Sequence, residues 1–196
     1  MSRLVVFDFD GTITRSDSML ALARYRYGLA GYLIRMTLLV PWFFFYTLGF
    51  YPNQRFKERF LRLFFGGMKA EAFNKLCEKF LHDRLKYLLR LSAVCCMEKH
   101  QQAGDRVLVI TASAENWVQP WCEESGVECL ASRLEVTDGV ITGKLIGKNC
   151  YGKEKVRRLL EVACPEEYDA LVVYGDSQGD HALGEMATQY FYNYFK

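Results

Sequence analysis

Two carboxylates, Asp8 and Asp10, stand two residues apart directly after an apolar run that begins at Leu4. Alternate residues of a strand point to the same face, so both acids start out on one face of a sheet. Two converging carboxylates repel each other unless one is protonated or a cation joins them, and Mg²⁺ is a cation that prefers oxygen ligands. The pair therefore predicts a magnesium site, with Gly11 allowing the backbone to turn away sharply.

A second pair of acids, Asp176 and Asp180, follows the apolar run 170–174, in a loop that leads into a helical pattern. If this run and the first one are neighbouring parallel strands, Asp176 lies beside Asp8. The carboxyl edge of an open α/β sheet is where such folds bind ligands. We therefore expect the two acid pairs to form one site.

Hydroxyl groups and a lysine add what a phosphate needs near these acids. The apolar run 106–110 ends in Thr111-Ala112-Ser113, where hydroxyls and the N–H groups of the next helix can bond phosphoryl oxygens. Lys155, with Lys153 as a near competitor, opens a later helical pattern and offers a compact positive charge. Acids, hydroxyls and a cation at the ends of separate elements predict a site for phosphoryl chemistry.

The elements that must hold these groups alternate between strands and helices. Periodicity and turn residues predict strands over residues 4–9, 106–110, 127–131, 134–137, 140–145 and 170–174, with 190–195 as a further edge strand. Helical patterns cover residues 17–27, 54–65, 70–91, 114–124, 152–162 and 179–186. Asp138-Gly139 is a hairpin turn between two of the strands. The alternation predicts an α/β fold, a Rossmann-like three-layer core with a central parallel sheet.

The helical block between the first two strands is too long for an ordinary crossover and indicates an inserted helical cap. We therefore expect a catalytic core from residues 1–16 and 100–196 and a cap from residues 17–99. Residues 18–67 hold seven basic side chains against one acid, together with fourteen of the twenty-nine aromatic residues of the chain. This part of the cap differs in character from the rest of the sequence.

An uncharged stretch, residues 36–54, lies inside this basic and aromatic segment. Its apolar part, 36–51, is shorter than the roughly 20 residues of a spanning helix, and Pro41 would kink it. Two interpretations stay open. The stretch forms a helical hairpin buried in the fold, or it forms a surface that dips into a membrane interface, flanked by arginine and aromatic anchors.

Composition excludes several classes of protein. With 196 residues, 51% hydrophobic and 24% charged, the chain is typical of a folded domain with a real core. A net charge of +2 gives no reason to expect a nucleic-acid partner. Seven scattered cysteines without a metal-binding spacing are typical of free thiols, so we expect a cytoplasmic protein, with contact to the inner face of a membrane left open.

The polar clusters resemble the four ordered motifs of the haloacid dehalogenase superfamily. The matching residues are Asp8-Phe9-Asp10-Gly11-Thr12, then Ile110-Thr111 with Ser113, then Lys155, then Gly175-Asp176-x-x-x-Asp180. The insertion after the first motif is similar to the helical C1-type cap of the phosphoserine-phosphatase-like branch. The resemblance covers nearly the whole chain, from residue 4 to about residue 187.

The resemblance implies a role for each of these residues. Asp8 would be the nucleophile that forms an aspartyl-phosphate, and Asp10 the general acid and then base. Mg²⁺ would be held by Asp8, the backbone carbonyl of Asp10 and Asp176, with Asp180 acting behind them. The transferring oxygens would be held by Thr111 and Lys155.

An acid at position 10 favours phosphate esters over halides within this superfamily, because a halide leaves without a proton. The resemblance therefore implies a phosphatase. Phosphoryl transfer between hydroxyl groups needs the same acid and stays open as an alternative, as does a module that binds a phosphorylated ligand without turnover.

The substrate is less defined by the sequence. Phosphoserine phosphatases carry a glutamate where this chain has Asp17, which is also a candidate helix cap, and an asparagine where it has Gly179. The aromatic cap is similar to the caps of bacterial phosphatases that act on phosphatidylglycerophosphate. Both a small soluble phosphomonoester and a lipid phosphate remain candidates. The residues expected to bind substrate are Gly11, Thr12, Asp17, Ala112, Ser113, Arg59 and Arg62.

Overall fold

Six strands form one sheet in the computed structural model, which describes residues 2–196. Their order across the sheet is β4-β3-β2-β1-β5-β6. All neighbours are parallel except β3 and β4, which form a hairpin. The strands are β1 (Leu4–Phe7), β2 (Arg106–Ala114), β3 (Glu128–Thr137), β4 (Val140–Ile146), β5 (Leu171–Gly175) and β6 (Gln189–Tyr192). The predicted α/β fold with a central, mostly parallel sheet is confirmed.

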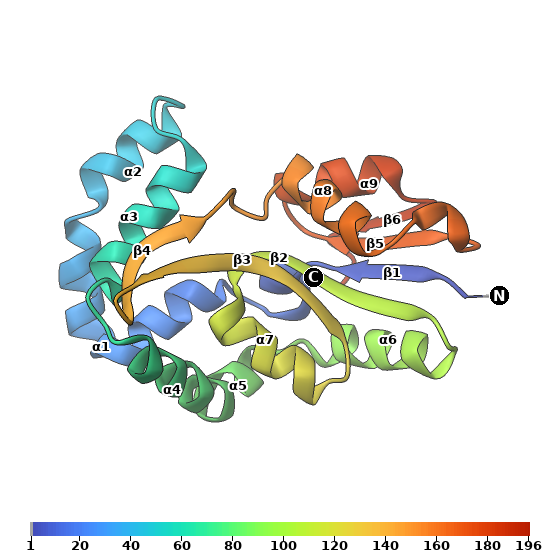
Figure 1. The fold of residues 1–196 in the computed structure, drawn as a ribbon, viewed down its shortest axis with the longest axis horizontal. Helices are drawn as coiled ribbons and strands as arrows, with labels where there is room; N and C mark the ends of the chain where they lie inside the picture. Colours follow the sequence, from blue (N-terminus) through green and yellow to red (C-terminus); the bar gives the residue numbers. More distant parts are fainter. Residues whose placement is uncertain (1) are drawn as a thin grey trace.

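The central strand β1 is apolar at every position because helices cover both faces of the sheet. Val5 and Phe7 belong to one buried cluster, and Leu4 and Val6 to another on the opposite face. Two helices cover each face, as Figure 1 shows: α6 (Leu91–Gln102) and α7 (Glu115–Glu124) on one side, α8 (Lys153–Val162) and α9 (His181–Met186) on the other. The three layers follow from this alternation.

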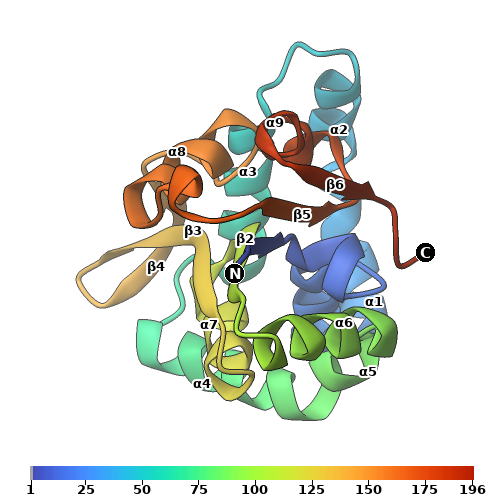
Figure 2. The same ribbon diagram turned by 90° about the vertical axis from the view of Figure 1, so that its right-hand side faces the viewer.

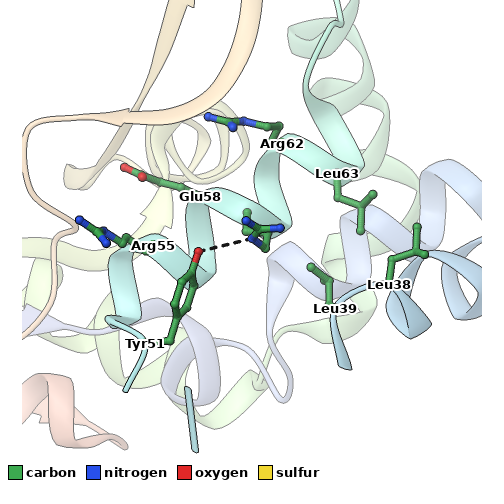
Figure 3. A pocket seen from close by; sticks show the side chains of 8 residues that line it. Leu38, Leu39, Tyr51, Arg55, Glu58, Arg62 and Leu63 are labelled. Atoms are coloured by element: carbon green, nitrogen blue, oxygen red, sulfur yellow. Dashed lines mark hydrogen bonds between the residues drawn. The ribbon is translucent and has the colours of Figure 1, made fainter. Parts of the chain in front are cut away.

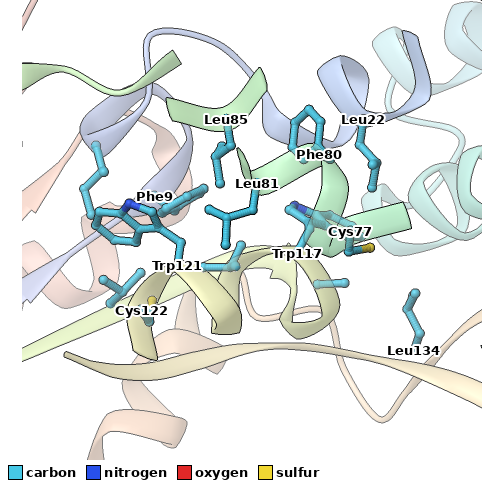
Figure 4. Close-up of a cluster of buried hydrophobic side chains, with 14 of the residues drawn as sticks. Phe9, Leu22, Cys77, Phe80, Leu81, Leu85, Trp117, Trp121, Cys122 and Leu134 are labelled. Carbon is cyan, nitrogen blue, oxygen red and sulfur yellow. The ribbon is translucent and has the colours of Figure 1, made fainter. Parts of the chain in front are cut away.

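A helical insertion separates β1 from β2. It contains α1 (Ser18–Thr37), α2 (Val40–Thr47), α3 (Asn53–Phe65), α4 (Ala70–Phe80) and α5 (Lys86–Leu88). Helix α3 packs along β4, and α4 packs against α7. Figure 4 shows the second contact, where Phe80 and Leu81 of the insertion lie near Trp117 and Trp121 of α7. This shared apolar cluster holds the insertion over the carboxyl edge of the sheet.

The predicted single helix over residues 70–91 is wrong. Helix α4 ends at Phe80, a wider helical turn follows, and Leu89 has extended backbone. The reason is a tertiary contact: the amide of Arg15 donates to Leu88 and the amide of Arg90 donates to Ile13. The chain therefore leaves the helix to pair with the segment after β1, and α6 begins as a separate helix that the sequence did not predict. The boundaries of the cap at residues 17–99 stay a prediction.

The hairpin was predicted correctly at its turn but not along its first strand. Asp138 and Gly139 have φ angles of 50° and 74°, as a two-residue hairpin turn requires. The two strands predicted over residues 127–131 and 134–137 are replaced by the one long strand β3, Glu128–Thr137. The predicted edge strand near the C-terminus exists as β6, parallel to β5.

The aromatic stretch of residues 36–51 is largely exposed. Helix α2 contributes no buried side chain to the core that residues 2–196 form, and Leu39 is the buried residue of this stretch. The interpretation as a buried hairpin is therefore wrong. Within the part of the chain that the structure describes, no single helix is long and apolar enough to cross a membrane; α1 and α2, bent by 62°, pass together on length and composition alone.

Helix α8 carries a charge cluster with a testable effect on stability. Glu154 is 7% exposed and accepts hydrogen bonds from Arg157 at 2.9 Å and Arg158 at 3.1 Å. The bonds from Arg157, and then those from Arg158, lower the pKa of Glu154 to about 2, from an ordinary 4.5. This stabilisation is therefore complete above about pH 4.5 and is lost as the pH falls toward 2.

We expect Glu154→Gln to lower the free energy of unfolding at pH 7 and to flatten its decline in acid. Urea unfolding at a series of pH values measures both effects. The matched control is Glu161→Gln, which removes an exposed partner of Arg157 from the same helix and should change stability less. Equal acid sensitivity in the wild type and in Glu154→Gln would contradict the prediction.

Candidate active site

The carboxyl end of β1 fixes the backbone of the site. The amide of Asp8 donates to the carbonyl of Tyr174 at 2.9 Å, so this acid is held between β1 and β5 and is 8% exposed. The chain then turns through Gly11, whose φ is 79°. A Cβ on Gly11 would lie 2.0 Å from Oδ2 of Asp176. A side chain at position 11 would therefore displace the Asp176 carboxylate, and glycine also tolerates this positive φ best.

A buried lysine joins two carboxylates of different loops. Nζ of Lys155 lies 2.8 Å from Oδ1 of Asp8 and 2.5 Å from Oδ1 of Asp180. Burial opposes the charge on Lys155, but the two carboxylates outweigh it and raise its pKa. Burial likewise disfavours the charge on Asp180, yet Lys155 holds the pKa of this acid below its ordinary value. Lys155 and Asp180 are therefore a charged pair beside Asp8, and the alternative Lys153 is exposed.

Asp180 also shapes the loop that carries Asp176. Its Oδ2 accepts hydrogen bonds from the amide of Asp176 at 3.2 Å and from the amide and hydroxyl of Ser177 at 3.0 and 2.9 Å. The bond from the Ser177 amide is part of a capping box at the start of the short helix after β5. Asp180 thus fixes both Lys155 and the loop of Asp176.

Three carboxylates of this site fit a divalent cation. Oxygen atoms of Asp8, Asp176 and Asp180 lie within 4.8 Å of one another. Burial raises the pKa of Asp8 to about 7, although Lys155 opposes the shift. Burial, followed by the charge of Asp180, also raises the pKa of Asp176. A hard cation such as Mg²⁺ suits this donor set, since it would offset the repulsion between the buried acids.

Asp10 belongs to the same site but forms hydrogen bonds with different residues. Its Oδ1 accepts hydrogen bonds from the amide of Ser18 at 2.7 Å and the hydroxyl of Thr14 at 3.3 Å, and its Oδ2 accepts one from the hydroxyl of Ser113. Ser18 is the first residue of α1, and its hydroxyl accepts a hydrogen bond from Nε1 of Trp117 at 2.9 Å. Asp10 therefore links the sheet to the first helix of the insertion.

The hydroxyl of Thr111 is positioned to donate into the site. Thr111 is almost fully buried, and its Oγ1 accepts a hydrogen bond from the amide of Ser113 at 3.1 Å. The hydroxyl hydrogen is therefore free for another acceptor. Residues 111–113 lie where the register between β2 and β3 shifts, and all three line the site together with Asp8 and Asp10.

Lys57 is a site residue that the sequence analysis missed. It extends from α3 to the carbonyl of Ala112 and lies 2.9 Å from Oδ1 of Asn149. Burial lowers its pKa to about 8, although Asp17 and Asp10 favour the charged form. A signal was present: Lys57 falls on the apolar face of α3, three residues before the buried Phe60.

Arg59 and Arg62, expected at the substrate, line a different cavity of about 470 Å³ on the outer side of α3. Arg59 is about 200° around the helix from Lys57. Its guanidinium lies 3.5 Å from the ring centre of Trp42. Its Nε donates to the hydroxyl of Tyr51 at 3.4 Å, the dashed line in Figure 3. The same helix therefore presents one cation to the acids and its arginines elsewhere.

A cavity of about 650 Å³ opens over the acids. Most of the expected site residues line it: Asp8, Asp10, Gly11, Asp17, Thr111, Ala112, Ser113, Lys155 and Asp176. The Asp17 carboxylate also accepts a hydrogen bond from the amide of Leu20 at 2.9 Å and so caps α1. Thr12 is buried, and its hydroxyl has no hydrogen-bond partner within residues 2–196. Away from the acids the cavity wall becomes apolar, with Met36, Phe43, Tyr46, Phe56 and Phe60.

The family is established by comparison with known proteins. The model of the haloacid dehalogenase-like hydrolase family matches residues 5–185, so the chain belongs to this family. It is 32% identical to the protein CicA of Caulobacter vibrioides over 98% of this chain and 86% of CicA. It is 25% identical to a histidinol-phosphatase of Neisseria meningitidis over 96% of this chain and 89% of that protein.

Solved structures agree with this assignment. A Bordetella pertussis protein of unknown function, 26% identical, superposes with a TM-score of 0.83 over 97% of this chain and 89% of its own. A substrate-bound phosphoserine phosphatase, 20% identical, has the same fold, with a TM-score of 0.72 over 98% of this chain and 86% of its own. The predicted haloacid dehalogenase-type hydrolase is confirmed, and its fold is that of phosphoserine phosphatases.

Proposed function

We propose that the protein hydrolyses phosphate monoesters in a Mg²⁺-dependent reaction, with the phosphoryl group carried on Asp8. The observation that carries this proposal is the position of Asp8. It lies at the end of β1 between the Lys155 cation and the acidic loop of Asp176, and Asp10 lines the same cavity. A nucleophile, a proton donor and a charge-stabilising group are thus available to one ligand.

In the first step a carboxylate oxygen of Asp8 attacks the phosphorus of the ester. The bond between phosphorus and the alcohol oxygen breaks, and Asp10 donates a proton to the departing oxygen. The hydrogen bonds from Ser18 and Ser113 hold the Asp10 carboxyl in the cavity while this transfer occurs. The products of the step are a free alcohol, a phosphoryl group on Asp8 and an ionised Asp10.

In the second step Asp10 takes a proton from a water molecule that attacks the same phosphorus. The bond between Asp8 and phosphorus breaks, inorganic phosphate leaves, and Asp10 is again protonated. Lys155 and the free hydroxyl hydrogen of Thr111 stabilise the charge that spreads over the phosphoryl oxygens in both steps. Each group therefore returns to its starting protonation state.

Asp8, Asp176 and the backbone carbonyl of Asp10 are the groups that would hold Mg²⁺. When bound there, the ion would polarise the phosphoryl group and neutralise part of its charge. Asp180 would keep the loop of Asp176 in place, since its carboxylate accepts a hydrogen bond from the amide of Asp176.

Removal of divalent metal should abolish turnover. We expect phosphate release from p-nitrophenyl phosphate to fall to background in EDTA and to return with excess Mg²⁺, while the circular dichroism spectrum stays the same. Continued release in EDTA would contradict the proposal.

The same assay tests the two alternative functions. Absence of release from any ester in the presence of Mg²⁺ would favour a module that only binds phosphorylated ligands. Transfer of the phosphoryl group to an added alcohol instead of water would favour a phosphotransferase.

Two substrate classes fit the cavity. Near the acids, Asp17 and Lys57 offer opposite charges, which suits a small polar leaving group. Farther out, the wall formed by Met36, Phe43 and Phe56 suits an acyl chain, and this observation favours a lipid phosphate as the second candidate. Phosphate release from phosphoserine, histidinol phosphate and sugar phosphates, beside phosphatidylglycerophosphate in mixed micelles, separates the two classes.

Lys57 should bind the anionic ester. We expect Lys57→Met to raise KM about tenfold or more and to change kcat less, because a charged hydrogen bond contributes roughly 1.5–3 kcal/mol. Since burial lowers the pKa of Lys57 to about 8, the wild-type KM should rise as the pH passes above 8. The Met variant should lack that rise, and Lys57→Arg should keep a low KM at all these pH values. Identical pH profiles of KM in the wild type and the Met variant would exclude this role.

The proposed compartment is a reducing one, the cytoplasm. All seven cysteines, which lie within the described residues, are free thiols. Cys77, Cys122 and Cys150 are buried in the core. This pattern supports the proposal, since disulfides persist mainly in oxidising compartments.

A further inference from the structure

The exposed apolar surface of the molecule is concentrated in one segment. Within residues 2–196, twenty large apolar side chains are exposed, and ten of them lie between residues 29 and 50. We call these ten the apolar ridge: Leu29, Leu33, Ile34, Leu38, Val40, Phe43, Phe44, Phe45, Leu48 and Phe50. Such a concentration of exposed large apolar side chains in one segment is unusual on a soluble surface and marks an interaction site.

The ridge projects from the fold. Helix α2 and the loop to α3 stand at the end of the molecule opposite the N-terminus (Figures 1 and 2). Phe44 is 59% exposed and Phe50 is 77% exposed, so these side chains contribute little to the packing of the insertion. The ridge is therefore able to contact a partner without rearrangement of the core.

A basic cavity adjoins the ridge. Arg55, Arg59 and Arg62 of α3 line it, and the ridge residue Leu38 forms part of its wall (Figure 3). None of these arginines forms an ion pair with an acid among residues 2–196. Glu58 also lines the cavity, but its carboxylate accepts hydrogen bonds from Gln54 and from the amide of Leu145. The positive charge beside the ridge is therefore available to an external anion.

We infer that this face docks on an anionic lipid bilayer. The ridge would enter the boundary between headgroups and acyl chains, and the unpaired arginines would contact lipid phosphates. Trp42 lies under the guanidinium of Arg59, and Tyr51 lines the basic cavity. Aromatic residues with one polar end are favoured at a membrane interface. An acidic protein partner would satisfy the arginines but would not require a protruding aliphatic and aromatic ridge of this extent.

Docking would bring the active-site cavity to the membrane. Phe43 belongs to the ridge and also lines the cavity over Asp8, together with Met36 of the same insertion. The mouth of the cavity would then lie at the lipid surface. The docking surface does not depend on the proposed hydrolysis, and its test uses binding rather than turnover.

The test is flotation of the full chain with vesicles of phosphatidylcholine alone or mixed with phosphatidylglycerol. We expect binding to the mixed vesicles that weakens as salt is added. The triple variant Phe44→Ser/Phe45→Ser/Phe50→Ser should bind at least about tenfold more weakly, because it removes three large apolar side chains that would be buried in the bilayer. The matched control is Tyr87→Ser/Leu91→Ser, which removes side chains that are 68% and 73% exposed outside the ridge and should bind like the wild type.

A variant without two of the arginines tests the basic cavity separately from the apolar ridge. Arg55→Gln/Arg62→Gln should lose the preference for phosphatidylglycerol and bind both kinds of vesicle equally weakly. The triple ridge variant should hydrolyse p-nitrophenyl phosphate in solution at the wild-type rate, which shows that it is folded and keeps failure of docking distinct from failure of the active site.

Two results would overturn the inference. One is wild-type vesicle binding by the ridge variant. The other is sedimentation of the wild type as a dimer that the ridge variant converts to a monomer, because the ridge would then be an interface between two copies of this chain.

Discussion

Asp8→Asn is expected to abolish phosphate release, with a loss of at least about four orders of magnitude in kcat. The amide has nearly the shape of the carboxylate, but it is a poor nucleophile and cannot carry the phosphoryl group. Residual binding of substrate should persist, since Lys155 and Thr111 remain in place. Phosphate release under saturating Mg²⁺ and substrate measures the loss.

The same variant should not be less stable than the wild type. Burial raises the pKa of Asp8 to about 7, so the ionised side chain is held in an unfavourable environment. Lys155 keeps its second partner, Asp180, when the charge at position 8 is removed. Thermal unfolding tests this point, with the exposed Asp169→Asn as a control for both stability and activity. Turnover by Asp8→Asn within tenfold of the wild type would contradict the assignment of the nucleophile.

Lys155→Met is the variant with the largest expected loss of stability. Lys155 is 1% exposed and pairs with two carboxylates, so its removal leaves Asp8 and Asp180 unpaired in the interior. Breaking a buried ion pair in this way costs about 3–5 kcal/mol. Turnover should also fall, because the positive charge beside the phosphoryl group is lost. The matched control Lys153→Met removes an exposed lysine from the same turn of α8 and should be near neutral.

A double variant shows whether the lost stability comes from unpaired charge. Adding Asp8→Asn to Lys155→Met removes one buried carboxylate, so the double variant should be more stable than Lys155→Met alone. Urea unfolding of the wild type, both single variants and the double variant completes the cycle. Strictly additive changes in the free energy of unfolding would show that Lys155 and Asp8 are not energetically coupled.

The centre of the fold and of the site could be predicted from the sequence because both are encoded locally. A short apolar run followed by acids at fixed spacing defines the ends of β1 and β5, and parallel neighbours bring Asp8 and Asp176 together. The turn at Asp138-Gly139 follows from two adjacent residues that tolerate positive φ. In each case the pattern lies within about ten residues.

Features that depend on distant contacts could not be predicted in the same way. The break before α6 arises because residues 88–90 hydrogen-bond to the segment after β1, more than seventy residues earlier. The separation of Lys57 from Arg59 and Arg62 required knowing which face of α3 meets the sheet. Likewise, the exposure of the aromatic stretch was undecided until the packing of α2 was known, because buried and membrane-facing helices share one composition.

The most direct test of the central claim is chemical trapping of the phosphorylated residue. Enzyme turning over its ester with Mg²⁺ is quenched in acid and treated with borohydride, which reduces an acyl phosphate to an alcohol, and the peptides are then mapped by mass. We predict homoserine at position 8, present only when substrate was added. Reduction at another carboxylate, or unmodified aspartate at position 8 during a measured burst of alcohol release, would contradict the account.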